Sequence, residues 1–394
     1  MKSVIARWVC GSAIVLALPN LALAQSAPPQ RGNAPVRHAK DLGLPTAREY
    51  RPPQGITFRA TFFFSENVRL AAQWFYAAEN EGRKLPTVIM ASDWGSTAVD
   101  FRESAVDLAR AGYLVMLFDY RGWGDSDGRV VPVGPQPVAS GGTFTARIRE
   151  LRGYIDPWEQ SEDWFNAISY AAASPGVDAD RIGIFGAGFS GGHILYVAAH
   201  EPRVKALASL VTNVDARPYK PYQPEPDKAI ANANAQASRI ANGQAPYPPD
   251  QEDVDGLTGA PVGNKLLRWA PVELTNRVSA PALFVLAEKE ERFSNLSNGQ
   301  LACDRVQGPR KMVMLSEITH DGVYGAARNQ AVTATVDWFD RYLKDPGATT
   351  RVPINEKEPE RGECDTPPLP PMGEENDSGF EEAPKAQNTP TRFN

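Results

Sequence analysis

Apolar residues form short runs that recur along most of the chain. The runs cover residues 56–64, 69–76, 87–91, 113–118, 182–185, 206–211, 282–287 and 312–315. Apolar runs of this length are typical of strands, and a run without alternation is typical of a strand buried on both faces. The pattern therefore predicts a series of strands, of which the first two form a pair.

Helical stripes separate these runs. Residues 100–111 carry apolar side chains at helical spacing and stop at Gly112, a common signal for a helix C-terminus. A further helix is predicted to start after Asp156, which stands as a cap before a proline. Others are predicted after Ser190 and over the stripe 332–343. Strands that alternate with helices predict an α/β layer fold with a mainly parallel sheet.

Two long connections interrupt this rhythm, at residues 129–155 and 213–270. The second contains prolines, aromatics and one predicted helix, and we expect it to lie over the carboxyl edge of the sheet as a cap insertion. Long connections inside compact domains are often functional lids. The α/β domain itself is expected to span residues 55–345.

The two ends of the chain differ from this domain in composition. Lys2 and Arg7 precede an apolar stretch that ends in an A-x-A cleavage signal and is shorter than the ~20 residues a membrane span needs. We therefore predict a signal peptide at residues 1–24 and an exported protein, periplasmic or secreted. Residues 25–54 are predicted to form an extended arm, and the Pro-rich acidic residues 346–394 a disordered tail.

Charge and cysteine content narrow the class of partner. The net charge of −6 gives no sign of nucleic-acid binding, and no later segment is apolar enough for stable membrane insertion. Cys10 leaves with the signal peptide, so Cys303 and Cys364 remain. An oxidising compartment permits a disulfide between them, with two unpaired thiols as the alternative. No pattern indicates an oligomeric state.

The stretch "RIGIFGAGFSGGHIL" fits two motifs at once. Gly186, Gly188 and Gly191 satisfy G-x-G-x-x-G, the dinucleotide fingerprint, and Asp215 lies about twenty residues on, where a ribose-binding acid belongs. The segment from Gly188 to Gly192 satisfies G-x-S-x-G, the turn that presents a nucleophilic serine. The glycines alone do not decide between pyrophosphate and hydroxyl.

Residues far downstream favour the interpretation of this stretch as a turn that presents a nucleophilic hydroxyl. His320 follows the strand at 312–315, and a run of glutamates follows the strand at 282–287. This is the order serine, acid, histidine of an α/β-hydrolase. A serine needs an imidazole to take its proton, and the imidazole needs a carboxylate to orient it. The order therefore predicts Ser190 as nucleophile and His320 as base.

Backbone amides complete the predicted centre. An oxyanion hole needs two N–H groups, one from the residue after the nucleophile and one from an earlier strand-to-helix loop. These requirements predict the amides of Gly191 and Trp94. Gly188 and Gly192 are expected to leave room for the tight elbow.

The sequence resembles serine hydrolases of the α/β-hydrolase superfamily, in their dienelactone-hydrolase-like and X-Pro-peptidase-like branch. The resemblance rests on "DYRGWGDSDG" and on R-I-G-x-x-G-x-x-x-S-G-G-H, and it covers about residues 55–344. It implies an acyl-transfer enzyme with Ser190 as nucleophile and His320 as base. It also implies an acid at Glu290, with Glu291 as the alternative.

One departure from this family lies before the oxyanion residue. The family often has His-Gly there, whereas this chain has Ser92-Asp93. A carboxylate next to a developing negative charge is costly unless it points away or is paired. We therefore expect Asp93 to point away from the oxyanion hole or to be paired.

These features predict an exported serine hydrolase that cleaves a carboxylic ester through an acyl-enzyme, with water as second substrate. No clustered metal-ligand set is present, and no cofactor is expected. The alternatives are a peptidase or amidase of the X-Pro-peptidase type, a non-catalytic protein on the same fold, and a dinucleotide-binding protein.

Overall fold

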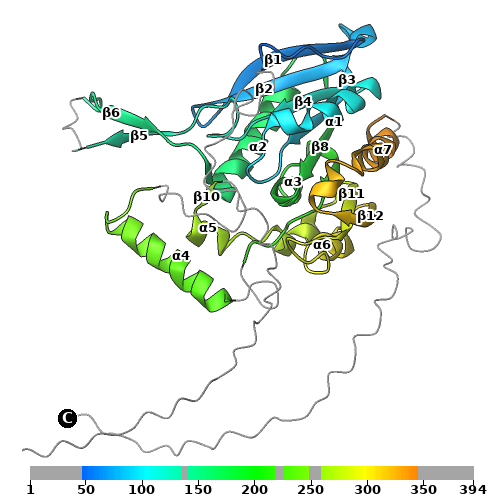
Figure 1. Ribbon diagram of the computed structural model, residues 1–394. Coiled ribbons are helices and arrows are strands. Elements are labelled where there is room, and N and C mark those ends of the chain that lie inside the picture. Colours follow the sequence, from blue (N-terminus) through cyan, green and yellow to red (C-terminus); the bar gives the residue numbers. More distant parts are fainter. Residues whose placement is uncertain (1–46, 135–140, 218–224, 248–258, 345–394) are drawn as a thin grey trace, which may run out of the picture.

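The computed structural model describes residues 47–134, 141–217, 225–247 and 259–344 (Figure 1). The predicted signal peptide, most of the predicted arm and the predicted tail lie outside these residues. Within the described residues, no helix is both long enough and apolar enough to cross a membrane.

A sheet of eight strands forms the centre, in the order β1-β2-β4-β3-β8-β9-β11-β12. These strands are β1 (Ile56–Ser65), β2 (Val68–Ala77), β3 (Leu85–Ala91), β4 (Leu114–Phe118), β8 (Val177–Ala187), β9 (Val204–Leu210), β11 (Ala282–Lys289) and β12 (Arg310–Thr319). The pairs β1–β2 and β2–β4 are antiparallel, and every other pair is parallel. The predicted strands and the mainly parallel sheet are confirmed.

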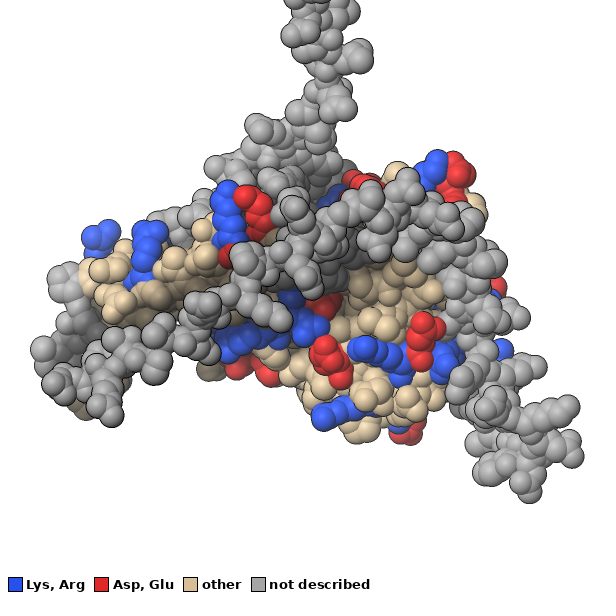
Figure 2. Space-filling model, turned by 90° about the horizontal axis from the view of Figure 1, so that it is seen from below, with Lys and Arg blue, Asp and Glu red and all other residues tan. Residues whose placement is uncertain are grey.

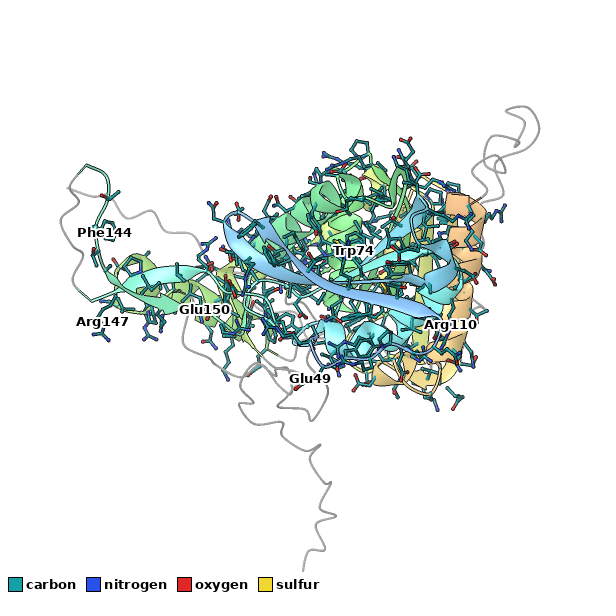
Figure 3. All side chains as sticks on the ribbon, turned by 90° about the horizontal axis from the view of Figure 1, so that it is seen from above. Glu49, Trp74, Arg110, Phe144, Arg147 and Glu150 are labelled. Carbon is teal, nitrogen blue, oxygen red and sulfur yellow. The ribbon has the colours of Figure 1, made fainter. Side chains whose placement is uncertain are left out.

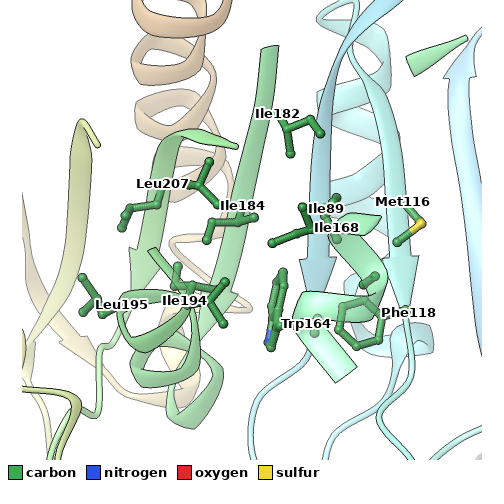
Figure 4. Close-up of a cluster of buried hydrophobic side chains, with 14 of the residues drawn as sticks. Ile89, Met116, Phe118, Trp164, Ile168, Ile182, Ile184, Ile194, Leu195 and Leu207 are labelled. Carbon is green, nitrogen blue, oxygen red and sulfur yellow. The ribbon is translucent and has the colours of Figure 1, made fainter. Parts of the chain in front are cut away.

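Helices cover both faces of the sheet. They are α1 (Ala98–Arg110), α2 (Pro157–Ala172), α3 (Phe189–Ala198), α6 (Gly299–Arg305) and α7 (Arg328–Phe339). Side chains of α2 and α3 share one buried cluster with the sheet, and side chains of α1 and α7 share a second cluster. Figure 4 shows the first cluster, with Trp164 and Ile168 of α2 facing the strands. The predicted α/β-hydrolase architecture of a helix-flanked sheet is confirmed.

Strand β8 illustrates why the sheet is buried on both faces. Ile182 and Ile184 belong to the cluster with α2 and α3, whereas Phe185 and Ala187 belong to the cluster with α1 and α7. Successive side chains of a strand point to opposite faces, so a continuous apolar run supplies both clusters. Burial of each large side chain contributes roughly 1.5–3 kcal/mol.

The predicted long connections carry structure of their own. Strands β5 (Val130–Val133) and β6 (Arg147–Glu150) form an antiparallel hairpin that projects from the body, as Figure 3 shows around Phe144 and Arg147. The short β7 (Tyr154–Ile155) pairs with β10 (Ala260–Pro261). The predicted cap insertion contains α4 (Pro226–Ala241), which has no buried residue, and α5 (Gly263–Leu266).

Two further predictions bear on the surface and on the cysteines. On the face that Figure 2 shows, Lys and Arg side chains are interspersed with Asp and Glu rather than gathered into one basic patch. Cys303 of α6 is buried and disulfide-bonded. Cys364, the residue with which the sequence permits a bridge, lies outside the described residues.

Candidate active site

The carboxyl ends of the parallel strands bring the candidate residues to one edge of the sheet. Gly188 directly follows β8, Glu290 directly follows β11, and His320 directly follows β12. Asp93 lies two residues beyond β3, which pairs with β8. In open α/β sheets, this edge is where ligands bind.

Gly188, and not Ser190, occupies the elbow between strand and helix. Its backbone has φ 54° and ψ −117°, a combination that strains a residue with a side chain. A sharp, strained turn between strand and helix is where α/β-hydrolases hold their nucleophile. The elbow position of this chain therefore carries no side chain.

The prediction that Ser190 stands at the tip of the elbow is wrong. Helix α3 begins at Phe189, so Ser190 lies within its first turn and is only 1% exposed. The Ser190 hydroxyl donates to the carbonyl of Ser92 at 2.5 Å and contacts the hydroxyl of Tyr120 at 2.5 Å. The structure does not bring Ser190 to His320, whose two ring nitrogens bond to other groups.

Asp93 fills the place that an elbow side chain would take. A Cβ atom built on Gly188 would overlap Oδ1, Cγ and Oδ2 of Asp93. Oδ1 accepts hydrogen bonds from the backbone N–H of Trp94 at 2.6 Å and of Phe189 at 2.8 Å. Phe189 follows the elbow residue, so these two amides stand where an α/β-hydrolase has its oxyanion hole.

Of the two predicted oxyanion-hole amides, the structure places one at this point. Trp94 donates there as predicted, but the N–H of Gly191 donates to the carbonyl of Gly188 at 3.0 Å. Because the elbow is two residues earlier than predicted, the second amide is that of Phe189. The prediction of Gly191 as the second amide is therefore wrong.

The other carboxylate oxygen of Asp93 meets the histidine. Oδ2 lies 3.1 Å from Nε2 of His320 and accepts from the hydroxyl of Tyr324 at 3.0 Å. Nδ1 of His320 lies 2.9 Å from both carboxylate oxygens of Glu290. The structure thus joins Glu290 and His320 as predicted, and it adds Asp93 in line with them. Glu291 instead accepts from the backbone N–H of His320 at 2.9 Å.

Asp93, His320 and Glu290 form one hydrogen-bonded row, which we call the relay. In the relay, charge pairing affects the pKa values more than burial does. Burial alone would lower the pKa of His320, but its hydrogen bonds and charge interactions with Asp93 and Glu290 raise that pKa to about 9. Burial alone would raise the pKa of Asp93, but His320 and the amides of Phe189 and Trp94 hold it below the usual value. At neutral pH the resting relay is therefore carboxylate, imidazolium, carboxylate.

The Asp93 carboxylate is the accessible member of this relay. Its side chain is 14% exposed, against 2% for His320 and 2% for Glu290. The partly buried rings of Trp94, Phe293 and Tyr324 surround the relay: Trp94 adjoins Asp93, and the other two rings pack edge-on against His320. Of these three side chains, that of Asp93 is therefore the most open to an approaching group, and aromatic rings lie beside it.

The remaining motif residues serve packing and positioning. A side chain on Gly192 would strike the carbonyl of Asn213, so this glycine lets helix α3 pack closely against that segment. The indole N–H of Trp164 donates to the Tyr120 hydroxyl at 2.7 Å, and Tyr120 contacts Ser190. Through the Ser92 carbonyl, Ser190 holds the loop that carries Asp93.

The same geometry argues against a dinucleotide. A pyrophosphate at the start of α3 would face the Asp93 carboxylate, which already takes the amide of Phe189. Asp215, the candidate ribose ligand, pairs with Arg217 at 2.6 Å. The described residues contain no group of three or more His, Cys, Asp or Glu that could hold a metal ion.

The fold and the elbow define an α/β-hydrolase. The family model of the X-Pro dipeptidyl-peptidase (S15) family matches residues 66–265, which is half of the chain, and the chain belongs to this family. The matched segment includes Asp93 and Gly188. Membership, together with the relatives below, supports an enzyme of hydrolase type.

Similar proteins include a thiohydrolase and a quorum-quenching protein. The thiohydrolase aneE of Aspergillus aculeatus is 25% identical, over 68% of this chain and 87% of its own length. The quorum-quenching protein AidA of Acinetobacter baumannii is 25% identical, over 52% of this chain and 70% of its own length.

Solved structures share the fold. The α/β-hydrolase GrgF of Penicillium superposes with a TM-score of 0.57 at 18% identity, covering 73% of this chain and 99% of its own. A hypothetical protein of Pseudomonas aeruginosa superposes with a TM-score of 0.59 at 17% identity, covering 75% and 96%. At these identities the likeness concerns the fold alone.

Sequence reasoning missed the elbow position and the central place of Asp93. Two signals were available. The glycines and the serine also fit G-x-Nu-x-S, with Gly188 in the place of the nucleophile Nu. The second signal was the carboxylate of Asp93 at a position where the family often has glycine. Gly188 lacks a side chain at the elbow, and Asp93 adds one beside it. Together these two departures indicate that the carboxylate of Asp93 takes the place of the missing elbow side chain.

Proposed function

We propose that this chain is an exported hydrolase that cleaves a small, uncharged carboxylic ester with water as second substrate. In this proposal Asp93, His320 and Glu290 carry the reaction, and Ser190 does not. One observation supports it above all: a carboxylate fills the side-chain space of the elbow residue and bonds to the histidine there.

The chemistry of the three residues supports this assignment. Carboxylates act as nucleophiles that form covalent intermediates in several classes of hydrolase. An imidazole within hydrogen-bond reach of the reacting group can take and return a proton. Glu290, on the far side of the ring, orients the imidazole and stabilises its charged form, which is the role of the acid in a triad.

An ester is favoured over the peptide that the family name suggests. Amide hydrolysis depends strongly on an oxyanion hole that is free to receive the carbonyl oxygen. Here both amides of the hole already donate to Asp93. An ester has the better leaving group and depends less on this stabilisation, and the partly buried rings beside Asp93 favour an uncharged, apolar group.

Hydrolysis of p-nitrobenzyl acetate by the purified chain tests the proposal. We expect acetate release by the wild type and a loss of about a thousandfold in kcat/KM for Asp93→Asn, because an amide is neither a nucleophile nor a base. Asp180→Asn, which changes an exposed carboxylate on β8, is the matched control and keeps full activity. A folded wild type that hydrolyses none of a panel of alkyl esters would favour the non-catalytic alternative.

Export is the second part of the proposal. The charged, apolar and A-x-A segments at the start of the chain support it, as does the disulfide at Cys303, since such bonds persist in oxidising compartments. Expressed with its natural start in a Gram-negative bacterium, the mature chain is expected outside the cytoplasm with an N-terminus shortly after Ala24. Cytoplasmic chains that retain Met1 would contradict export.

A further inference from the structure

We propose that Asp93 attacks a saturated carbon that carries a leaving group, so that the ester bond breaks on its alcohol side and the alkyl group passes through a covalent ester of Asp93. This inference rests on the proposed function and names its route and its wider substrate class. It follows from where the two oxygens of the carboxylate lie.

The occupied oxyanion hole disfavours an acyl route. In acyl transfer, the oxygen of the substrate carbonyl must enter the hole as it becomes negative. Oδ1 of Asp93 already occupies that place, held by the amides of Trp94 and Phe189 at 2.6 and 2.8 Å. A substrate carbonyl would meet a carboxylate there, and like charges repel. The acyl route thus lacks its main source of stabilisation.

The same two amides favour an alkyl route. Once Asp93 is esterified through Oδ2, its own carbonyl oxygen is Oδ1, which already lies in the hole. Water that adds to Cγ then places the negative charge on Oδ1, where both amides receive it without any movement. The arrangement that obstructs acyl transfer is therefore preorganised for the hydrolysis of an alkyl ester of Asp93.

The first step forms one bond and breaks one. A lone pair of Oδ2 forms the bond to the saturated carbon, and the leaving group departs with its bonding pair. Asp93 loses its negative charge in this step, so His320 loses one of the two carboxylates that hold its proton. That proton leaves with the departing group, directly or through water, and the imidazole becomes neutral.

The second step restores the resting state. Neutral His320 takes a proton from water through Nε2 as the water oxygen adds to Cγ of Asp93. The intermediate collapses, the Oδ2–Cγ bond breaks, and the alcohol leaves with Oδ2 and the proton from His320. The carboxylic acid that remains returns its proton to His320. In sum, an alkyl compound and water give an alcohol and the protonated leaving group.

This route defines the substrate class. The reacting carbon is saturated, unhindered and bears a leaving group such as a carboxylate, a halide or an epoxide oxygen. Resting Asp93, His320 and Glu290 hold one net negative charge, which disfavours anionic substrates. The hydroxyl of Tyr324, whose pKa burial and the neighbouring Asp93 raise, stays protonated and orients Oδ2.

Oxygen-18 water locates the broken bond. The wild type is given p-nitrobenzyl acetate in labelled water, and both products are analysed by mass spectrometry. We expect the label in p-nitrobenzyl alcohol over many turnovers and none in acetate. In a single turnover the alcohol stays unlabelled and the peptide that contains Asp93 gains one label, because Asp93 supplies the first oxygen. Label in acetate would overturn the inference.

A trapped intermediate gives independent evidence. His320→Gln retains a hydrogen-bonding side chain but cannot take a proton from water, so we expect the intact protein to gain the mass of one p-nitrobenzyl group, located on Asp93. Asp93→Asn should gain none. His320→Gln that stays unmodified while the wild type is active would contradict the covalent step.

The substrate pair separates this inference from the proposed function. p-Nitrophenyl acetate has no saturated carbon on its alcohol side, so the alkyl route predicts no turnover above that of Asp93→Asn. Activity that needs Asp93 but labels acetate sinks only the inference. Activity that survives Asp93→Asn sinks the proposed function as well.

Discussion

The exchange between positions 93 and 188 can be tested by reversing it. Gly188→Ser restores a side chain at the elbow, and Asp93→Gly removes the carboxylate that fills its space. If the two positions share one volume, each change alone harms the protein, and the second change relieves part of the harm done by the first. The four proteins, wild type included, form a double-mutant cycle.

The size of the effect follows from the geometry. A non-glycine residue at φ 54° and ψ −117° costs on the order of 1–3 kcal/mol. The serine side chain also displaces the Asp93 carboxylate, and a net loss of one hydrogen bond to this charged group costs roughly 1.5–3 kcal/mol. From these two costs, Gly188→Ser alone is expected to lose about 3–6 kcal/mol. The double variant should be about 2–3 kcal/mol more stable than additivity predicts.

Urea unfolding of the four proteins measures this coupling, and a fluorophosphonate probe reports on chemistry. The wild type should stay unlabelled. The double variant presents a new hydroxyl at the elbow, beside His320 and a free pair of amides, and we expect the probe at position 188 only. Additive free energies of unfolding, or a Gly188→Ser protein as stable as the wild type, would refute the shared volume.

Two further predictions concern the relay. The pKa of His320 is raised from 6.5 to about 9, so the protonated imidazole stabilises the folded protein fully below pH 6.5, and this stabilisation is lost as pH rises through 9. The free energy of unfolding in urea should therefore fall by about 3 kcal/mol over this range. An equal fall in Asp93→Asn would contradict the pairing of Asp93 with His320. Glu290→Gln should lower kcat/KM by at least about a hundredfold, because Nδ1 of His320 loses its carboxylate partner. Glu291→Gln, which changes only the acceptor of the His320 backbone N–H, should lower kcat/KM by no more than about threefold. The reverse order would make Glu291 the acid.

The strands and helices were predictable because their apolar patterns are strong. Residues 114–118 of the first continuous run form β4, and the run at 282–287 lies in β11; the core residues of both strands are buried on both faces. The partnership of His320 and Glu290 was predictable for a related reason. Each follows a parallel strand, and the carboxyl ends of parallel strands meet at one edge of the sheet.

The register of the elbow was not predictable from the motif alone. The segment "GAGFSGG" contains small residues at every second position, so it fits the nucleophile pattern in two registers that differ by two residues. The choice depends on where β8 ends and α3 begins, and both boundaries are set by packing against neighbouring strands. The structure ends β8 at Ala187, which makes Gly188 the elbow and turns Ser190 inward.

The role of Asp93 depends on three segments that lie far apart in the chain. Its carboxylate is explained only by the missing side chain of Gly188, the amide of Phe189 and the imidazole of His320. From the sequence, a carboxylate near an oxyanion hole indicates repulsion, which the resemblance alone could not resolve. In the structure it is paired, and the cost of placing a negative charge there is offset by four hydrogen-bond donors.

The central claim is that the reaction depends on Asp93 and not on Ser190. The most direct measurement compares kcat/KM of Asp93→Asn and Ser190→Ala on p-nitrobenzyl acetate, with both variants shown to be folded. We predict that Ser190→Ala keeps activity within about fivefold of the wild type and that Asp93→Asn loses about a thousandfold. A Ser190→Ala variant as inactive as one without the His320 imidazole, beside an active Asp93→Asn, would contradict the account.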